Sequence, residues 1–303
     1  MFNFFKKQPP QNSNLSEKQI EKMLEKAKRL DEAAHYESAF ELYKQAADAG
    51  HPRGCRAAGY CYLYGEGTEC DQEKGLKYLQ HAGVLGDSQA SLILAKFYSS
   101  EQLSGEKKSP TKANMYLLEA AQHHNKEAML MLGRAYYYCA ERFDIKKVDM
   151  GSVEYWMAPA MEAANADDFG ILADACSFTD QPERAMQYLK EAINRKHIGS
   201  MITMADIYFF NTSVAKRYGL GEQNKDFDKG DDYLRLAMET AFEKGKSFLN
   251  KPGELSRLYL DSCRGSLKQV RARYELLHSF APEQRYPQLK IEQIDIYLAE
   301  LKA

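Results

Sequence analysis

The stretch "AAGYCYLYGEGTECDQEKGLKYLQHAGVLGDSQA", residues 57–90, holds the pattern that decides the fold. Its paired glycines, Gly65 and Gly67, suit either a loop that cradles a phosphate or a turn between two helices. A phosphate loop of the dinucleotide type follows a buried strand, and a Walker loop continues into Gly-Lys-Ser or Gly-Lys-Thr. Here the glycines follow a helical pattern, and the stretch contains no such tripeptide. We therefore predict that Gly65 ends one helix in the left-handed conformation and that Asp71 caps the next.

The same pattern recurs along the chain in register with six alanines. Each alanine stands eight residues before a mostly small residue, and five of the six have an aromatic residue four places upstream. Residues four apart lie on one face of a helix, so the aromatic residue and the alanine share a face. Asp168 is the one partner that does not fit. The pairs are Ala46 and Gly54, Ala82 and Ala90, Ala120 and Ala128, Ala160 and Asp168, Ala192 and Ser200, and Ala237 and Gly245.

The sequence also predicts where the helices of this repeat begin. Eleven residues before four of the alanines stand Asp71, Ser109, Asp149 and Asp226, which are good N-cap residues. The repeating unit is therefore a helix of about 14 residues, a tight turn, a second helix and a loop of variable length. Successive alanines lie 36, 38, 40, 32 and 45 residues apart, so the loops absorb the variation.

These residues resemble the Sel-one-like repeat family, a branch of the tetratricopeptide-repeat superfamily. The resemblance is strongest over residues 57–98 and extends over about residues 36–249. It implies an all-α, right-handed α-α superhelix, a solenoid of about six helix-turn-helix repeats with a C-terminal helical cap. It also implies an adaptor or scaffold role. The sequence departs from the family in its Gly-x-Gly element, which returns only at Gly219 and Gly221.

The ends of the chain differ from its middle. Residues 1–14 are polar, contain prolines and have no periodicity, so we expect a flexible N-terminal arm. Residues 15–250 carry the helical repeats. Residues 251–303 have the pattern of capping helices that close the last apolar face.

Bulk composition argues against several classes of partner. The formal net charge of -2 gives no overall basic field that would attract nucleic acid, although the basic segment 264–273 leaves a local contact open. No apolar run approaches the length of a membrane span or a signal peptide, so we expect a cytoplasmic chain without stable membrane insertion. The oligomeric state is not predictable from these features.

No catalytic, cofactor or metal site is predicted. Adjacent residues on a helix point about 100° apart, so His123 and His124 do not converge on one ion, and no third ligand is suitably spaced. The sequence contains no known hydrolase or metalloprotease motif. Two alternatives stay open, an enzyme with an unrecognised site in the long loop 211–227 and a self-assembling structural scaffold.

The excess of aromatic residues favours a non-enzymatic protein-interaction module. We call the apolar residue twelve places after each alanine the reference residue. Groove-facing positions are expected two, five and six residues after it. Aromatic and basic residues are frequent there, and we expect them to hold an extended peptide or a helix. Lys96 and Arg134 would favour an acidic, hydrophobic segment; alternatively, the aromatic rings pack between repeats. The predicted partner-binding residues are Tyr60, Tyr64, Lys96, Arg134, Tyr137, Tyr138, Phe178, Asp206, Phe209 and Phe210.

Overall fold

In a computed structural model, every regular element of the described residues is a helix. The structure describes residues 15–100, 108–210, 213–249, 251, 253–280 and 284–302. Contacts divide the chain into two compact units, residues 1–160 (unit 1) and 161–303 (unit 2). The all-α prediction is therefore confirmed, whereas the arm predicted at residues 1–14 lies outside the described residues. The domain boundaries at residues 14 and 250 stay predictions.

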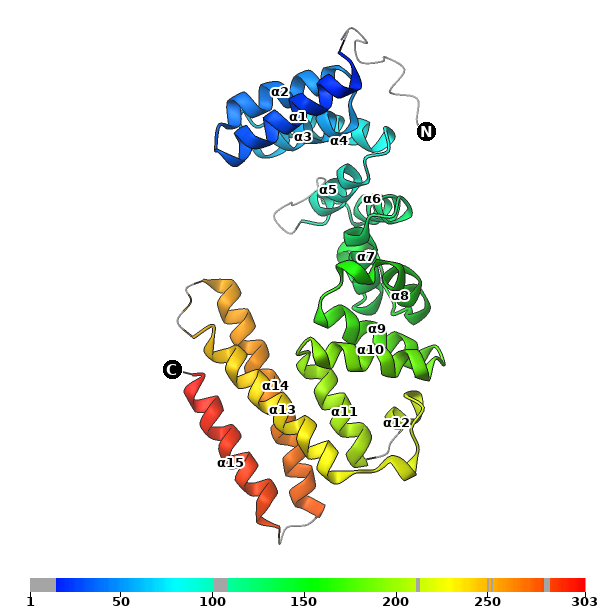
Figure 1. Cartoon of the computed structure of the whole chain (residues 1–303), viewed down its shortest axis with the longest axis vertical. Coiled ribbons are helices and arrows are strands. Elements are labelled where there is room, and N and C mark those ends of the chain that lie inside the picture. Colours follow the sequence, from blue (N-terminus) through cyan, green and yellow to red (C-terminus); the bar gives the residue numbers. More distant parts are fainter. Residues whose placement is uncertain are drawn as a thin grey trace. The chain divides into compact units, whose positions relative to one another are not determined.

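Unit 1 is a row of helix pairs, shown in blue to green in Figure 1. Its helices pack mainly on their neighbours along the chain, as a repeat array requires. Their bounds are α1 Glu17–Glu32, α2 Tyr36–Asp48, α3 Pro52–Tyr64, α4 Gln72–Val84, α5 Ser88–Tyr98, α6 Pro110–Gln122, α7 Lys126–Tyr137, η2 Glu141–Phe143 and α8 Met150–Met157.

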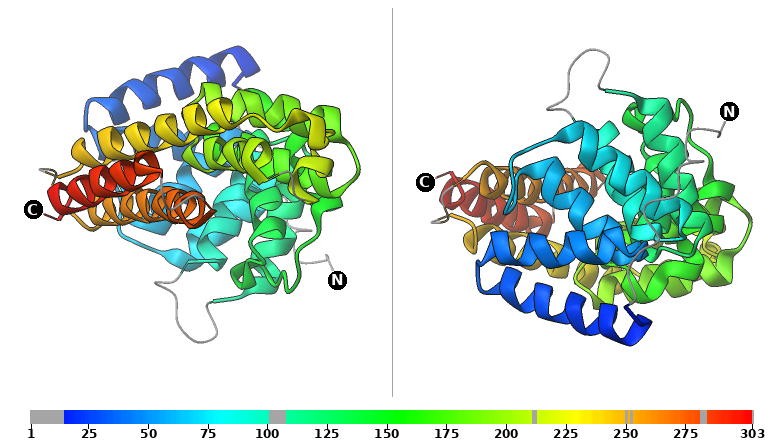
Figure 2. Two further views of the ribbon diagram at one scale, coloured as in Figure 1. Left: turned by 90° about the horizontal axis from the view of Figure 1, so that it is seen from below. Right: turned by 90° about the horizontal axis from the view of Figure 1, so that it is seen from above.

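Unit 2 continues with shorter helices and ends in three long ones. Figure 2 shows α13, α14 and α15 side by side from two directions, and their buried residues form one apolar core with those of α11. The predicted capping helices are thus present. After η3 Ala158–Ala163, which spans the boundary between the units, the bounds are α9 Ala166–Phe178, α10 Pro182–Asn194, α11 Ile198–Phe210, α12 Ser213–Arg217, η4 Glu222–Asn224, α13 Phe227–Lys246, α14 Glu254–Phe280 and α15 Arg285–Glu300.

Local signals in the sequence fix these helix ends. Gly65 ends α3 at φ 78°, and its N–H donates to the Cys61 carbonyl over 2.8 Å. Asp71 then caps α4, its carboxylate accepting from the Lys74 N–H at 3.0 Å. A Cβ on Gly67 would lie 2.2 Å from the Tyr36 carbonyl oxygen, so only glycine fits there. The Gly-x-Gly is a helix-to-helix turn, as predicted.

The spacing of eight between alanines and small residues also has a structural cause. Ala46 and Gly54 meet where α2 and α3 cross, so closely that a Cβ on Gly54 would lie 2.7 Å from that of Ala46. Asp168 breaks the rule because its side chain turns back to cap its own helix. It accepts the Asn165 N–H at 2.9 Å, while its own N–H donates to the Asn165 side chain. This capping box satisfies two amides at the start of α9.

Many of the aromatic residues form a repeated seam inside the helix pairs. Tyr62 stacks on Tyr78 with ring centroids 5.7 Å apart, and Tyr98 stacks on Tyr116 at 5.8 Å. The same arrangement returns in unit 2, where Tyr208 stacks on Tyr233 at 6.0 Å. Part of the aromatic excess is therefore structural, as the alternative interpretation of the sequence expects.

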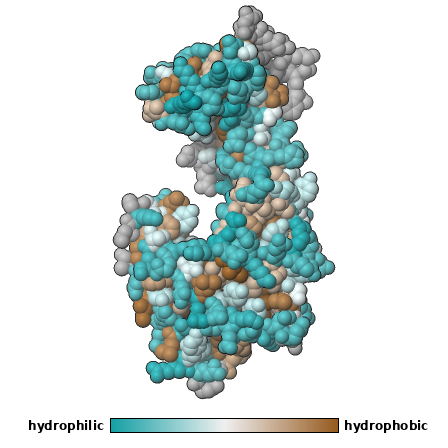
Figure 3. Space-filling view, viewed as in Figure 1, coloured by the Kyte–Doolittle hydropathy of each residue, from teal (hydrophilic) through white to brown (hydrophobic). Residues whose placement is uncertain are grey.

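On the side of the molecule shown in Figure 3, exposed apolar residues form small patches among hydrophilic ones rather than one large apolar face. Among the described helices, none is both long and apolar enough to cross a bilayer.

Candidate partner-binding site

The predicted groove positions divide into two classes in the structure. Residues two and six places after the reference residue are half-buried or exposed wherever they are described, for example Tyr60 and Tyr64 in α3. Residues five places after it are buried in four of five repeats. The buried ones are Leu63, Ser99, Ser177 and Phe209.

Phe209 is therefore a correction to the predicted site. Its side chain is 4% exposed, and its ring packs against Gly230 of α13 and against Phe227, with ring centroids 5.3 Å apart. In this repeat the fifth place faces α13, the other helix of the pair, and Phe209 also borders a surface cavity with Phe227 and Phe280. Tyr137, at the same place in α7, is half-buried. The side chain of Phe210 lies outside the described residues.

Three residues of the exposed class in unit 1, Tyr60, Tyr64 and Lys96, line a cavity of about 510 Å³. The side chains of Tyr60 and Tyr64 are 39% and 52% exposed, and their rings lie 4.6 Å apart. The cavity runs over α1, α3 and α5, so three successive odd-numbered helices contribute to one surface. We call it the tyrosine cavity; its lining is Asp31, Tyr43, Arg56, Ala57, Tyr60, Cys61, Tyr64, Glu66, Gln89, Ile93 and Lys96.

The cations of the tyrosine cavity are engaged with carboxylates that do not line it. Lys96 Nζ lies 2.6 Å from Glu127 Oε1, and Arg56 Nε lies 2.9 Å from Asp87 Oδ2. The two acids of the lining are Asp31 and Glu66. Within the described part of the chain, neither of them makes an ion pair.

Burial and nearby carboxylates keep the hydroxyls of Tyr60 and Tyr64 and the thiol of Cys61 protonated. Burial, followed by the charge of Glu66, raises the pKa of Tyr60 and of Tyr64. The same two causes raise the pKa of Cys61 to about 12, so this thiol is a poor nucleophile. The cavity therefore offers aromatic faces, hydroxyls and the carboxylates of Asp31 and Glu66, and its thiol is not activated.

Three further predicted residues, Arg134, Tyr137 and Tyr138, lie in α7 or directly after it. Tyr138 is well exposed, and its ring meets that of Tyr137 edge to face at 4.9 Å. Arg134 is half-buried and makes contacts with its neighbours. Neither of the tyrosines nor Arg134 lines the tyrosine cavity.

In unit 2 other side chains of the chain contact the equivalent positions, although the Phe178 side chain remains 58% exposed. The Arg217 guanidinium lies 4.0 Å from the centre of the Phe178 ring, and the Tyr218 hydroxyl donates to Asp174 Oδ1 at 3.1 Å. Asp206 accepts two hydrogen bonds from Arg273, at 2.8 and 3.2 Å. The Phe178 ring and the Asp206 carboxylate thus each contact an arginine of the chain.

The predicted long loop 211–227 supplies two of these contacting side chains, Arg217 and Tyr218. Its residues 213–217 form α12, and Tyr218 behind them is buried against α9. Burial and the adjacent Asp174 raise the pKa of Tyr218, so it stays a neutral donor. Residues 211 and 212 lie outside the described residues.

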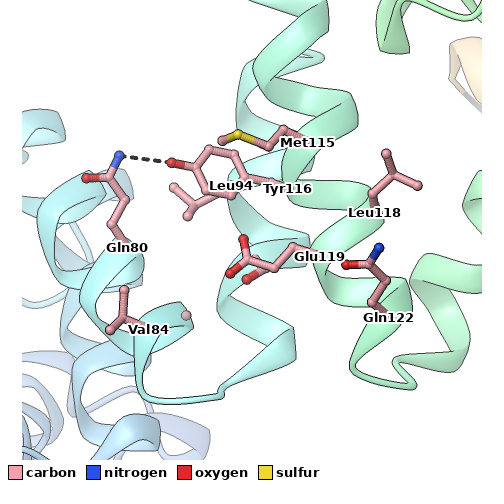
Figure 4. Close-up of a pocket in the computed structure, with 10 residues that line it drawn as sticks. Gln80, Val84, Leu94, Met115, Tyr116, Leu118, Glu119 and Gln122 are labelled. Atoms are coloured by element: carbon pink, nitrogen blue, oxygen red, sulfur yellow. Dashed lines mark hydrogen bonds between the residues drawn. The ribbon is translucent and has the colours of Figure 1, made fainter. Parts of the chain in front are cut away.

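A second surface crevice lies between α4 and α6, with α5 at its base (Figure 4). Its volume is about 500 Å³, and Val84 and Met115 form exposed apolar walls. Gln80 donates to the Tyr116 hydroxyl at 3.1 Å across the crevice. None of the predicted groove residues lines it.

One group of potential metal ligands occurs among the described residues. The ligand atoms of Glu17, Glu21 and His51 lie within 4.8 Å of one another. Arg53 already supplies a cation here, with its Nη1 2.7 Å from Glu21 Oε2. His51, which is 7% exposed, lies 3.3 Å from the other oxygen of Glu21. We interpret this cluster as ion pairs that hold α1 on the start of α3.

The basic segment 264–273 uses its arginines within unit 2. Arg264 donates to the Leu301 carbonyl, and Arg271 bonds Asp295 at 2.8 Å. Together with the Arg273–Asp206 pair, these contacts hold α14 against α15 and α11. They also lower the charge that the segment would present to a nucleic acid.

Comparison with known proteins gives two kinds of relative. Elongation factor 2 kinase of Rattus norvegicus is 26% identical over 160 residues, which are 46% of this chain and 22% of the kinase. The same kinase of Homo sapiens is 27% identical over 135 residues, or 42% of this chain and 18% of the kinase. The chain thus spans about a fifth of the length of these curated relatives.

Two solved structures have similar folds. A Sel1 repeat protein from Oxalobacter formigenes matches with a TM-score of 0.49 and 18% identity, over 74% of this chain and 91% of that one. The c5321 protective antigen of uropathogenic Escherichia coli matches at 0.48 and 15%, over 95% of this chain and 72% of that one.

A family match covers the helix pairs directly. The Sel1 repeat matches residues 36–51, 52–87, 88–125, 126–156 and 178–197. The second, third and fourth of these segments contain the pairs α3 and α4, α5 and α6, and α7 and α8. Through these five repeats, the chain belongs to the Sel1 repeat family.

Proposed function

We propose that the chain is a non-enzymatic, cytoplasmic protein-interaction module that holds an extended peptide or a helix of its partner in the tyrosine cavity. The observation that carries this proposal is the pair of exposed rings, Tyr60 and Tyr64, in a hollow built by α1, α3 and α5. Tyrosines provide a large amphipathic contact area at low conformational-entropy cost. Sel1 repeats, like related helical repeats, commonly serve as scaffolds for other proteins.

The two units support this choice differently. In unit 2 Arg217 lies on the Phe178 ring, and Tyr218 and Arg273 bond Asp174 and Asp206, so a partner would compete there with the chain's own side chains. In unit 1 the rings of the tyrosine cavity are open. The site proposed from the sequence therefore narrows to unit 1, with Tyr138 after α7 as an outlying contact.

We expect replacement of Tyr64 by Ala to lower partner affinity by more than about 1 kcal/mol, because exposed aromatic anchors contribute that much at interfaces. Affinity purification with wild-type chain, Tyr64→Ala and Tyr60→Ala would identify proteins retained by the first alone. Titration of such a protein would then measure the loss. The melting temperature should stay unchanged, since neither ring belongs to the core.

Tyr155→Ala is the matched control, because Tyr155 is more exposed and lies in α8, away from the cavity. Partner retention by Tyr64→Ala equal to that of the control would place the contact elsewhere. Met115→Asp would then test the crevice of Figure 4.

The competing proposal is an enzyme. The match to the elongation factor 2 kinases covers only about a fifth of their length. Kinase activity is therefore a property of those proteins. We expect the purified chain to transfer no phosphate from ATP to protein substrates and to show no hydrolase or redox turnover. Reproducible turnover that is lost on changing a residue of 213–227 would favour the enzyme. Light scattering after size exclusion separates a monomeric binder from a self-assembling scaffold.

A further inference from the structure

In unit 2 the contacts of Phe178 show which kind of side chain packs on the sixth place after the reference residue. Phe178 is at the same place in α9 as Tyr64 is in α3, six residues after the reference residue. The side chain over Phe178 is an arginine, with its guanidinium carbon 4.0 Å from the ring centre. Two repeat positions in unit 2, Phe178 and Asp206, thus both contact arginines of the same chain.

The tyrosine cavity also presents rings and carboxylates, but in the described part of the chain no arginine lies over its rings. Its rings are open, and Asp31 and Glu66 stand at its edge without an ion pair in the described part of the chain. Its cations, Lys96 and Arg56, are each paired with a carboxylate outside the lining. The charged groups of the lining that have no ion-pair partner in the described residues are therefore the carboxylates of Asp31 and Glu66.

Resting on the proposed function, we propose that the tyrosine cavity takes an arginine side chain of the partner segment. The planar guanidinium would lie on the face of Tyr64, as Arg217 lies on Phe178, while Asp31 and Glu66 balance its charge. Lysine fits less well, because its ammonium is more strongly hydrated and does not stack as a plane.

An arginine ligand has the opposite charge to the acidic partner segment that the sequence predicts. The sequence predicts an acidic segment because Lys96 and Arg134 are expected near the rings. In the structure, a carboxylate of the partner would have to displace Glu127 from Lys96 and would approach Asp31 and Glu66. Like charges at an interface oppose association, so the cavity disfavours such a segment.

Selection of random peptides displayed on phage, with the immobilised full chain as bait, tests the inference without a known partner. Three baits are compared: wild-type chain, the double variant Asp31→Asn with Glu66→Gln, and Glu73→Gln. The last is the matched control, because it removes an exposed carboxylate of α4 that does not line the cavity. We expect arginine with apolar neighbours to be enriched on wild-type and control chains, and this preference to be lost on the double variant.

A selected peptide then serves as a fluorescent probe in a double-mutant cycle. Replacing its arginine with glutamine should weaken binding to the wild-type chain about tenfold or more, and binding to the double variant by less than about twofold. Added salt should weaken the wild-type complex, because part of the attraction is between exposed charges.

The outcomes separate the two proposals. Enrichment of acidic or uncharged peptides, with binding still lowered by Tyr64→Ala, overturns the arginine inference and leaves partner binding at the cavity in place. Equal enrichment on wild-type chain and on the double variant also overturns it. Failure of any peptide to bind wild-type chain better than Tyr64→Ala overturns the proposed function together with the inference.

Discussion

Replacing Phe209 with Ala is expected to destabilise unit 2 by about 3–5 kcal/mol, the range found when a buried phenylalanine is truncated. The ring belongs to the core shared by α11, α13, α14 and α15, and it lies directly on Gly230. Glycine leaves the space that the ring fills, so no larger side chain is present to close the cavity. Urea unfolding followed by circular dichroism would show the loss as an earlier transition for unit 2.

Phe280→Ala is the control for this experiment. Phe280 carries the same side chain in the same unit but is 72% exposed, so its loss should change stability by less than about 0.5 kcal/mol. If Phe209→Ala is as stable as Phe280→Ala and instead loses partner binding, Phe209 faces a groove. In that case α11 would have a different helical register in solution.

The case of Phe209 shows why the groove is harder to predict than the helices. The fifth and sixth places of each repeat are adjacent residues that point about 100° apart on the helix. Both fit an aromatic residue, and the difference between them depends on where the other helix of the pair lies. Tyr64 is open and Phe209 is buried because of tertiary packing that no local pattern encodes.

Local features are predictable because they depend on near neighbours in the sequence. Asp71 and Asp226 cap helices through the amide three residues later, and Gly65 ends α3 through its own positive φ. Asp168 is an exception to the alanine pattern only because its role belongs to another local pattern, the capping box with Asn165. The Asn-x-x-Asp spacing in the sequence is the signal for it.

Contacts distant in the sequence account for the remaining differences. Tyr218 reaches Asp174 across 44 residues, and Arg273 reaches Asp206 across 67. Such pairs turn predicted binding positions into internal contacts. A sequence pattern specifies that an acid or a ring lies on a helix face, but the residue that covers it is determined by the whole fold of unit 2.

The crossing of α2 and α3 gives the second large expected effect, on unit 1. Replacing Gly54 with Ala adds a Cβ 2.6 Å from the Ala46 carbonyl carbon and 2.7 Å from the Ala47 nitrogen. Because these are backbone atoms, α2 itself must move away, and other contacts along the crossing are lost. We expect a destabilisation of about 3 kcal/mol or more, at the upper end of overpacking costs.

The loss of stability from overpacking must exceed the gain in helix propensity that alanine brings. A net destabilisation by Gly54→Ala is therefore a strict test of the close crossing. Alanine is favoured over glycine inside a helix by about 0.5–1 kcal/mol. Gly265→Ala in α14 isolates that gain, because a Cβ there meets no atom within 4 Å, so this variant should be more stable than the wild type. Ala90 and Ala128 occupy the position equivalent to Gly54, so the repeat also tolerates a wider crossing. If urea unfolding finds Gly54→Ala as stable as the wild type, α2 shifts readily to that wider arrangement, and the close approach of Ala46 and Gly54 does not stabilise unit 1.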